Sequence, residues 1–386
     1  MQIEKEKDRF WEIRPYSGAA EEGAALKRIS SHPLLDNIAA YLYPGQSSSL
    51  LRDKIASLES VDQFQAQVML FAIEKIVENS VEKLSYSGFE KLKDLKSRLL
   101  ISNHRDIMLD SALTQVLLHI NHLPTSEMAV GDNLVTDPFL EDVARSNKMI
   151  KVNRSGSPKE IYNNSILLSH YIRERIESQS SSVWIAQRNG RTKNGDDITE
   201  QGVLKMLNMS GGGDFYQNFS NLSITPIAIS YQIEPCDFFK ARELMISQVK
   251  KYIKSPGEDL NSILAGLLNN KGNIHITLCD RLSEEELLEC SRGERNERFQ
   301  LLGRAIDQKI WSNYKIWDNN MIAFDMLQKE PQYSHLYSAD RYLQFEEYLN
   351  SYLKEIDNKN EKENFRNIFL SIYANPLVNK NRVEGK

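Results

Sequence analysis

Two hydrophobic patterns divide the chain. Up to residue 95 the apolar residues recur at helical spacing, and those of the stretch 60–84 gather near one 3.6-residue face. The Pro44-Gly45 pair predicts a break between shorter helices in this region. No alternation typical of strands occurs before residue 98. We therefore expect residues 1–95 to form an N-terminal helical region.

From residue 98 onward, short apolar runs alternate with segments of helical spacing. The predicted strands are 98–102, 127–130, 148–153, 181–187, 223–231 and 273–278. The predicted helices between them are 106–120, 138–147, 156–179 and 199–210. This rhythm is typical of an α/β fold, so residues 96–281 should form a mainly parallel sheet flanked by helices.

The remaining residues, 282–386, have helical spacing and many charges. Regularly placed aromatic residues, among them Trp317 and Phe345, indicate a packed helical C-terminal extension. We expect the last seven residues, "KNRVEGK", to be disordered.

Composition limits the classes of protein that fit. The chain has 386 residues, of which 41% are hydrophobic and 26% charged, as in globular proteins with a substantial core. The net charge of −5 argues against general nucleic-acid binding. Cys236, Cys279 and Cys290 form no C-x-x-C pair, so neither a disulfide framework nor a zinc cluster is expected, and a reducing compartment is favoured.

No segment is suited to crossing a membrane. The first thirty residues are too charged for a signal peptide, and no run approaches the roughly 18 apolar residues that span a bilayer. We expect a protein of the cytoplasm, either free or peripheral on the inner face of the cytoplasmic membrane.

Polar side chains follow four of the predicted strands. They are Asn103-His104-Arg105-Asp106, Gly131-Asp132-Asn133, Asn153-Arg154 and the run Gln187–Gly195. Because ligands of parallel α/β sheets bind outside the carboxyl ends of the strands, these groups should converge on one edge.

The chemistry of this edge combines a histidine, carboxylates and arginines. A histidine with a nearby carboxylate can deprotonate a hydroxyl or amine, and arginines bind phosphate or carboxylate groups. Each of these residues, taken alone, has a simpler explanation. One histidine near an aspartate is usually structural, and the helix dipole explains Asp106. Together they favour group transfer to a nucleophile of an anionic substrate.

Four stretches resemble the sequence blocks of the glycerolipid acyltransferases, which include the glycerol-3-phosphate and lysophosphatidic acid acyltransferases. They are "SNHRDIMLD", "IKVNRSG", "AQRNGRTKNG" and "ITPIAIS", in the family's order and within residues 102–230. The resemblance implies an O-acyltransferase of phospholipid or related lipid biosynthesis. Its donor is a thioester, acyl-CoA or acyl carrier protein, and its acceptor is a lysolipid or a molecule like glycerol phosphate.

The resemblance also implies roles for single residues. His104 would be the general base that deprotonates the acceptor hydroxyl, an aspartate would orient it, and acyl transfer would be direct, with no metal or organic cofactor. Pro226 would shape a strand end near the acyl site. The acceptor's acidic group would be bound by residues of the second and third blocks: Arg154, Arg188, Asn189, Gly190, Arg191 and Lys193.

Two departures from the family pattern matter. Five residues rather than four separate His104 from Asp110, while Asp106 is too close. The continuation "DSAL" favours Asp110 as the partner, with Asp106 as the second choice. The family's glutamate should fall near Arg188 or Asn189, and neither is acidic.

These departures keep other functions open. One is a catalytically impaired protein on the same fold that binds lipid or acyl carrier protein. Another is a phosphate-ester hydrolase, in which water attacks and a metal ion assists. The acceptor is open as well: lysophosphatidic acid, glycerol-3-phosphate, or a hydroxyl of an amino-acid-containing lipid.

Overall fold

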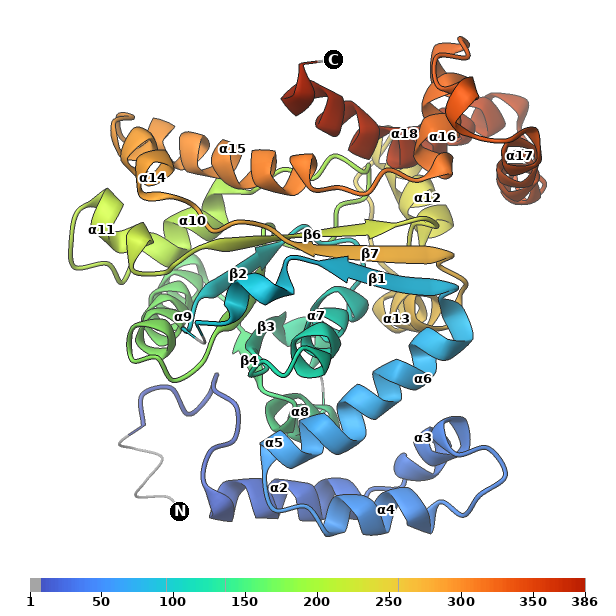
Figure 1. Ribbon diagram of the computed structural model, residues 1–386. Coiled ribbons are helices and arrows are strands. Elements are labelled where there is room, and N and C mark those ends of the chain that lie inside the picture. The colour runs from blue at the N-terminus through green and yellow to red at the C-terminus, as the bar shows by residue number, and fades with distance from the viewer. Residues whose placement is uncertain (1–7, 95, 136, 256, 386) are drawn as a thin grey trace.

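A seven-stranded sheet organises the structure, a computed structural model that describes residues 8–94, 96–135, 137–255 and 257–385. The strand order is β1-β7-β6-β2-β5-β3-β4 (Figure 1). The strands are β1 (Lys83–Ser87), β2 (Leu99–Ser102), β3 (Glu127–Gly131), β4 (Met149–Val152), β5 (Val183–Ala186), β6 (Thr225–Tyr231) and β7 (Asn273–Leu278). Among these described strands only β6 and β7 pair in antiparallel fashion, so the predicted mainly parallel sheet is confirmed.

Helices surround the sheet and extend the fold at both ends of the chain. Before the sheet come α2 (Ala19–Ser31), α3 (Leu35–Leu42), α4 (Ser49–Ala56), α5 (Val61–Phe64), a π-helical turn (Gln65–Met69) and α6 (Leu70–Ser80). Between the strands lie α7 (Leu109–Ile120), α8 (Pro138–Ser146), α9 (Pro158–Glu177), α10 (Gln201–Asn208), α11 (Phe215–Ser220), α12 (Asp237–Ser247) and α13 (Glu258–Leu268). After it come α14 (Glu284–Ser291), α15 (Glu297–Ser312), α16 (Asp318–Gln328), α17 (Ala339–Leu353) and α18 (Lys359–Glu384).

Alternating side chains of the strands form two cores, one on each face of the sheet. Leu99 and Ile101 of β2 pack in the same cluster as residues of α9, α10 and α15. Leu100 points to the other face and packs with residues of α6 and α7. Figure 1 shows α15 and α7 on opposite sides of the sheet. Burial on both faces explains why the central strands are short continuous apolar runs.

The N-terminal region is not wholly helical, which corrects our expectation for residues 1–95. Lys83–Ser87 forms β1, an edge strand that pairs in parallel with β7. Its sequence, KLSYS, is mostly polar and partly exposed, so it lacks the hydrophobic signal of the central strands. Its pairing with β7, nearly 190 residues along the chain, stabilises the strand. The predicted division at residues 95 and 281 stays a prediction.

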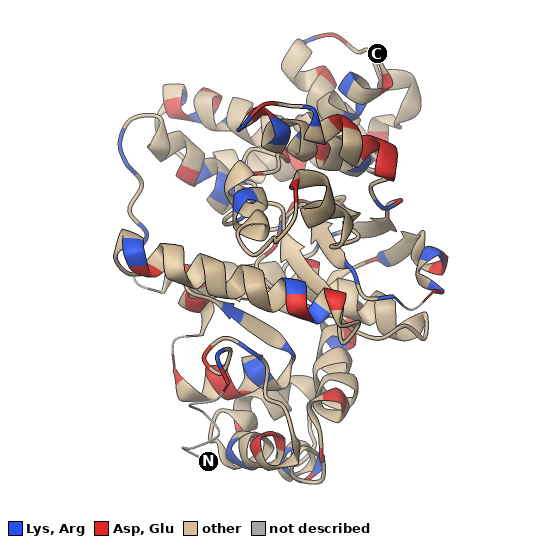
Figure 2. Ribbon diagram, turned by 90° about the vertical axis from the view of Figure 1, so that its left-hand side faces the viewer, with Lys and Arg blue, Asp and Glu red and all other residues tan. Residues whose placement is uncertain are grey.

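The C-terminal extension is helical, as predicted, and it is ordered further than we expected. Helix α18 continues to Glu384, so the expectation of disorder from residue 380 is wrong for the residues described. Lys380 donates to the Tyr314 carbonyl and Asn381 to the Tyr333 hydroxyl, which fixes this last part of the helix. Figure 2 shows acidic and basic positions interspersed along the helices rather than separated.

Two of the helices, α9 and α18, contain 20 and 26 residues. Neither of them, nor any other helix in the described ranges, is apolar enough over a sufficient length to cross a bilayer.

Burial of Asp307 in α15 makes stability depend on pH. Its carboxylate accepts from Thr199 N at 2.9 Å and Thr199 Oγ1 at 2.5 Å. Burial raises the pKa of Asp307 from 3.8 to about 7, although the bonds from Thr199 oppose the shift. Because the folded protein holds the proton of Asp307 more tightly than the unfolded chain does, protonation of this group stabilises the fold. This stabilisation is complete below the pKa of the unfolded chain, 3.8, and is lost as the pH rises through the pKa of the folded protein, about 7.

We predict that Asp307→Asn gains stability relative to the wild type as the pH rises. The amide keeps an acceptor oxygen for Thr199 but cannot ionise. Because one pKa unit is about 1.4 kcal/mol, the gain in free energy of unfolding between about pH 4 and about pH 8 should be about 2–4 kcal/mol. Urea denaturation at a series of pH values measures it, with the exposed Asp53→Asn as the control. Parallel curves for Asp307→Asn and wild type would contradict the prediction.

Candidate active site

The predicted site residues meet in one cavity at the carboxyl edge of β2, β3, β4 and β5. The cavity has a volume of about 710 Å³. Its lining includes seven of the nine residues predicted for the site: His104, Arg154, Arg188, Asn189, Gly190, Arg191 and Lys193. The other two, Asp106 and Asp110, are fully buried. Helices α12 and α13 also contribute to the lining, through Phe239 and Ser262 among others.

His104 is paired with Asp110. The distance from His104 Nδ1 to Asp110 Oδ2 is 2.9 Å, and the histidine side chain is only 14% exposed. Because the carboxylate accepts, Nδ1 carries the proton and Nε2 keeps its lone pair. Nε2 forms no hydrogen bond with any residue that the structure describes, while the ring lines the cavity. The arrangement suits a base whose free nitrogen faces a ligand.

A loop before α7 accommodates the extra residue of the first block. Residues 103–108 form a loop between the end of β2 and the start of α7 at Leu109. Asp110 Oδ2 accepts from the backbone N–H of Arg105 at 2.6 Å and of Asp106 at 2.9 Å. The carboxylate therefore organises the loop as well as the histidine, and the five-residue spacing is compatible with the pair.

Asp106 has a different role in the same loop. Its Oδ1 accepts from the backbone N–H of Met108 and Leu109 at 2.9 and 2.8 Å, which caps the start of α7. Burial raises the pKa of Asp106, and the neighbouring Asp110 carboxylate raises it further. Asp106 thus binds backbone N–H groups at the start of α7, where the helix dipole also favours a carboxylate, and Asp110 makes the contact with histidine.

Tyr231, at the carboxyl end of β6, contacts Asp110, and nothing in the sequence indicates this contact. Its hydroxyl donates to Asp110 Oδ1 at 2.8 Å. Burial, with the charge of Asp110, raises the tyrosine pKa well above its ordinary value, so the hydroxyl stays a donor. Both Asp110 oxygens are therefore occupied. The sequence pattern does not identify Tyr231 as a site residue, because it is the last residue of a mostly apolar strand and could equally belong to the core.

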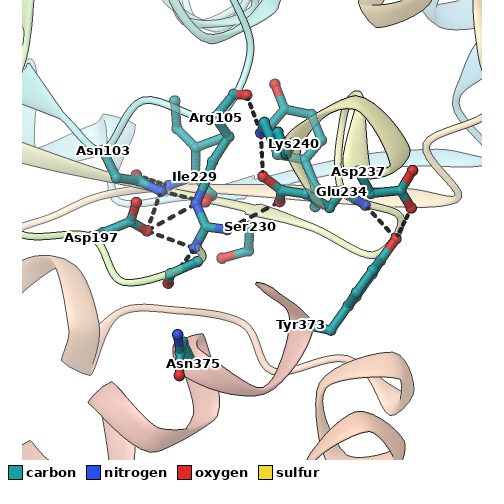
Figure 3. Close-up of polar contacts among 12 residues, drawn as sticks. Asn103, Arg105, Asp197, Ile229, Ser230, Glu234, Asp237, Lys240, Tyr373 and Asn375 are labelled. Carbon is teal, nitrogen blue, oxygen red and sulfur yellow. Dashed lines mark hydrogen bonds and ion pairs between the residues drawn. The ribbon is translucent and has the colours of Figure 1, made fainter. Parts of the chain in front are cut away.

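A buried ionic cluster lies on the other side of the His104 loop (Figure 3). The Arg105 guanidinium donates to Asp197 Oδ2 at 2.7 and 2.9 Å and to Glu234 Oε2 at 3.0 Å. Lys240 Nζ bridges Glu234 and the Arg105 carbonyl at 2.5 and 2.6 Å. Burial alone would lower the Arg105 pKa, but Asp197 and Glu234 hold it well above its ordinary value.

This cluster fixes the position of residue 105 and hence of the histidine before it. Asn103, on the other side of His104, donates to Asp197 and exchanges two hydrogen bonds with the Ile229 backbone. Both neighbours of His104 in the chain are thereby tied to the 187–200 loop, and Asn103 is also tied to β6.

The cavity contains two arginines without a carboxylate partner. Lys193 pairs with Glu243, and Arg188 lies 3.5 Å from Glu200. Arg154 and Arg191 form no ion pair within the described residues, and Arg191 Nη1 is buried without a hydrogen-bond partner there. An anionic ligand would satisfy both guanidinium groups.

Two glycines shape this part of the cavity. Gly190 has φ +70°, a left-handed conformation that side chains disfavour, and its missing Cβ leaves open space. At Gly131, a Cβ would lie 2.6 Å from the Asn133 side-chain oxygen and 3.2 Å from the Arg154 guanidinium carbon, so a larger residue would crowd both side chains at the end of β3. Gly131 was noted in the sequence only as part of a polar strand end.

Two features of the family blocks remain, the proline of the fourth block and the missing glutamate of the third; the role of Pro226 near an acyl site stays a prediction. Pro226 is the second residue of β6, near its amino end, and it does not line the cavity. Proline is tolerated there because the start of a strand can spare an N–H. The third block itself has no glutamate, but a carboxylate from farther along the chain lies beside it: Glu200 Oε2 accepts from Asn189 N at 3.0 Å.

We predict that Arg105→Met destabilises the fold by about 3–5 kcal/mol, because Asp197 and Glu234 would keep buried negative charge without their shared cation. Urea denaturation measures the change. The control is Arg9→Met, which removes a surface ion pair with Glu174 whose side chains are more than half exposed and should cost less than about 1 kcal/mol. Equal, small losses in both variants would show that the cluster does not stabilise the fold.

One comparison with known proteins, a family model, bears on this part of the chain. Residues 83–230 match the family model described as Acyltransferase. Among solved structures, the crystal structure of the 1-acyl-sn-glycerophosphate (LPA) acyltransferase PlsC from Thermotoga maritima is similar, with 9% identity and a TM-score of 0.38. That match covers 74% of this chain and 93% of the other. No curated protein sequence matches the chain.

The matched segment contains β1 to β5, all but the last residue of β6, the His104–Asp110 pair and all the predicted cavity arginines. The predicted resemblance is thus confirmed for this part of the chain: residues 83–230 match the acyltransferase family model.

Proposed function

We propose that the protein transfers a fatty acyl group from an acyl thioester to a hydroxyl of a phosphate- or carboxylate-bearing lysolipid, with His104 as the general base. The observation that supports this best is the 2.9 Å contact between His104 Nδ1 and Asp110, within an acyltransferase domain and beside a cavity with unpaired arginines. Acyl-CoA and acyl carrier protein are the candidate donors.

The proposed reaction needs only one proton shuttle. His104 Nε2 takes the proton of the acceptor hydroxyl as its oxygen attacks the thioester carbonyl carbon. The C–O bond forms, the C–S bond breaks, and the departing sulfur takes the proton from the imidazolium. Asp110 stabilises that imidazolium, while its two backbone contacts and Tyr231 keep the carboxylate in place.

Acceptor recognition would rest on Arg154 and Arg191. Their lack of carboxylate partners distinguishes them from Lys193 and Arg188, which have Glu243 and Glu200. Gly190, which has a left-handed backbone conformation and no side chain, would let the acidic headgroup approach the backbone of the third block. The side-chain amide of Asn189 could donate a hydrogen bond to the same headgroup. Glu200 holds the backbone of this block through Asn189 N, next to the proposed headgroup site.

We predict that His104→Ala lowers the transfer rate by about 10²–10⁴-fold, the usual contribution of a positioned general base. Labelled acyl-CoA and acyl carrier protein, each incubated with lysophosphatidic acid, glycerol-3-phosphate and an amino-acid-containing lysolipid, would report transfer. His119→Ala is the control, because His119 is exposed on α7.

The outcomes separate the alternatives. Transfer that survives His104→Ala would remove the proposed base. If the wild type transfers to none of the acceptors but still binds lysolipid or carrier protein, the impaired binding protein would be the correct description.

We predict that Arg154→Gln and Arg191→Gln each raise KM for an anionic acceptor by about 10–100-fold, as expected from the loss of a charge-assisted hydrogen bond. The value of kcat should change less, because these groups bind the headgroup rather than the reacting atoms. Steady-state kinetics with an uncharged acceptor of the same chain length provides the control. A similar rise in KM for both acceptors would contradict headgroup recognition.

A further inference from the structure

The segment that connects α12 to α13 exposes unusually large apolar side chains. Val249 is 87% exposed and Ile253 is 81% exposed, more than any other large hydrophobic residue in the described part of the chain. Exposing such side chains to water is unfavourable, so an apolar partner would stabilise them. They belong to the short sequence "VKKYIK".

Helix α13, which follows this segment, also exposes apolar side chains. Leu260, Leu264 and Leu268 are spaced four residues apart, so they share one face of the helix, and all three are about half exposed. The opposite face is buried: Gly266 packs against the Asp106 carboxylate. The leucine face is therefore the outer face of a helix whose inner face supports the site.

Basic residues lie within the same segment. Lys250 and Lys251 form no ion pair with any described carboxylate, and Lys254 pairs with Asp259. Together with Val249, Ile253 and the three leucines, Lys250 and Lys251 define what we call the α12–α13 surface.

This surface adjoins the cavity. In Figure 1, α12 and α13 lie on opposite sides of the sheet, so the segment between them passes the sheet edge. Phe239 and Leu244 of α12 and Glu258 and Ser262 of α13 line the cavity itself. A partner on the α12–α13 surface would therefore lie beside the entrance to the candidate active site.

We propose that the α12–α13 surface docks the protein on an anionic lipid bilayer, with Val249, Ile253 and the leucines entering the apolar boundary and Lys250 and Lys251 contacting acidic headgroups. This inference rests on the proposed function, since a lysolipid acceptor and its product reside in such a bilayer. The combination of apolar side chains with unpaired cations is the one that interfacial segments use.

A carrier protein fits this surface less well than a bilayer. Lys250 and Lys251 would suit an acidic protein, but the most exposed side chains are aliphatic and protrude from a connecting segment. A deformable apolar phase can accept Val249 and Ile253 together with the leucine face of α13, whereas a rigid partner would need a matching groove.

The experiment measures co-sedimentation of the full chain with vesicles of phosphatidylcholine alone or mixed with phosphatidylglycerol. The wild type should bind the mixed vesicles, and Val249→Ser/Ile253→Ser should lower the partition coefficient by about tenfold or more. Lys250→Gln/Lys251→Gln should weaken binding to mixed vesicles severalfold and leave binding to neutral vesicles unchanged. Circular dichroism shows that each variant is folded.

The matched control is Leu34→Ser/Ile38→Ser on α3, another helix with exposed apolar residues, which has Asp36 beside them. This variant should bind like the wild type. Absence of wild-type binding, loss of binding in the α3 variant alone, or binding that the α12–α13 variants leave unchanged would each overturn the proposal. It would also be overturned if Lys250→Gln/Lys251→Gln lost affinity for acyl carrier protein but not for vesicles.

A second readout separates this proposal from the proposed function. Val249 and Ile253 do not line the cavity, so Val249→Ser/Ile253→Ser should keep wild-type kcat/KM on a short-chain, monomeric acceptor and lose about tenfold on a vesicle-borne one. Failure of transfer with every acceptor would reject the enzyme while the sedimentation result would still decide the docking surface.

Discussion

The buried carboxylate of Asp110 is the interaction on which the candidate site depends. It contacts His104 Nδ1 and two backbone N–H groups through one oxygen, and the Tyr231 hydroxyl through the other. A fully buried carboxylate is costly unless it is hydrogen-bonded, and these four donors supply what water would supply. Because the same groups hold the histidine and shape the loop, one carboxylate sets both the orientation of the ring and the path of the chain.

The ionic cluster around Arg105 connects this site to the C-terminal extension. Asp197, which receives the Arg105 guanidinium, also accepts from the Tyr314 hydroxyl, and its backbone carbonyl accepts from Trp311 Nε1. The Tyr373 hydroxyl donates to Asp237 Oδ2 at 2.6 Å and accepts from Glu234 N at 3.1 Å (Figure 3). The helices after the sheet therefore hold the charged loops around the site.

This connection gives the extension a structural function. Gly195 lies so close to the Ile372 carbonyl that a Cβ would come within 2.1 Å of it, and Asn375 donates to the Asn194 carbonyl. Residues 194 and 195, which directly follow the loop of Arg188 to Lys193, are thus packed against α18. The proposed acceptor site and the proposed lipid-docking surface then flank one cavity, with rigid support on the C-terminal side.

The sequence by itself determined the architecture and the location of the site. Apolar runs and helical spacing predicted six of the seven strands, and the parallel topology placed His104, Arg154 and Arg191 at one edge, since parallel strands end together. Such patterns occur where residues close together in the sequence are buried against the same core. They missed β1, whose polar sequence is stabilised by a partner almost 190 residues away.

Only the tertiary structure decided which groups touch. The spacing left Asp106 and Asp110 open, and the choice depended on a loop that turns one carboxylate toward the histidine and the other toward the start of α7. Tyr231 and Glu200, like the partners of Arg105, come from distant segments, so no short-range pattern identifies them. Whether two buried groups form a hydrogen bond or ion pair depends on differences of a few tenths of an ångström in the distance between them. Packing of the whole fold sets these distances, and sequence spacing does not.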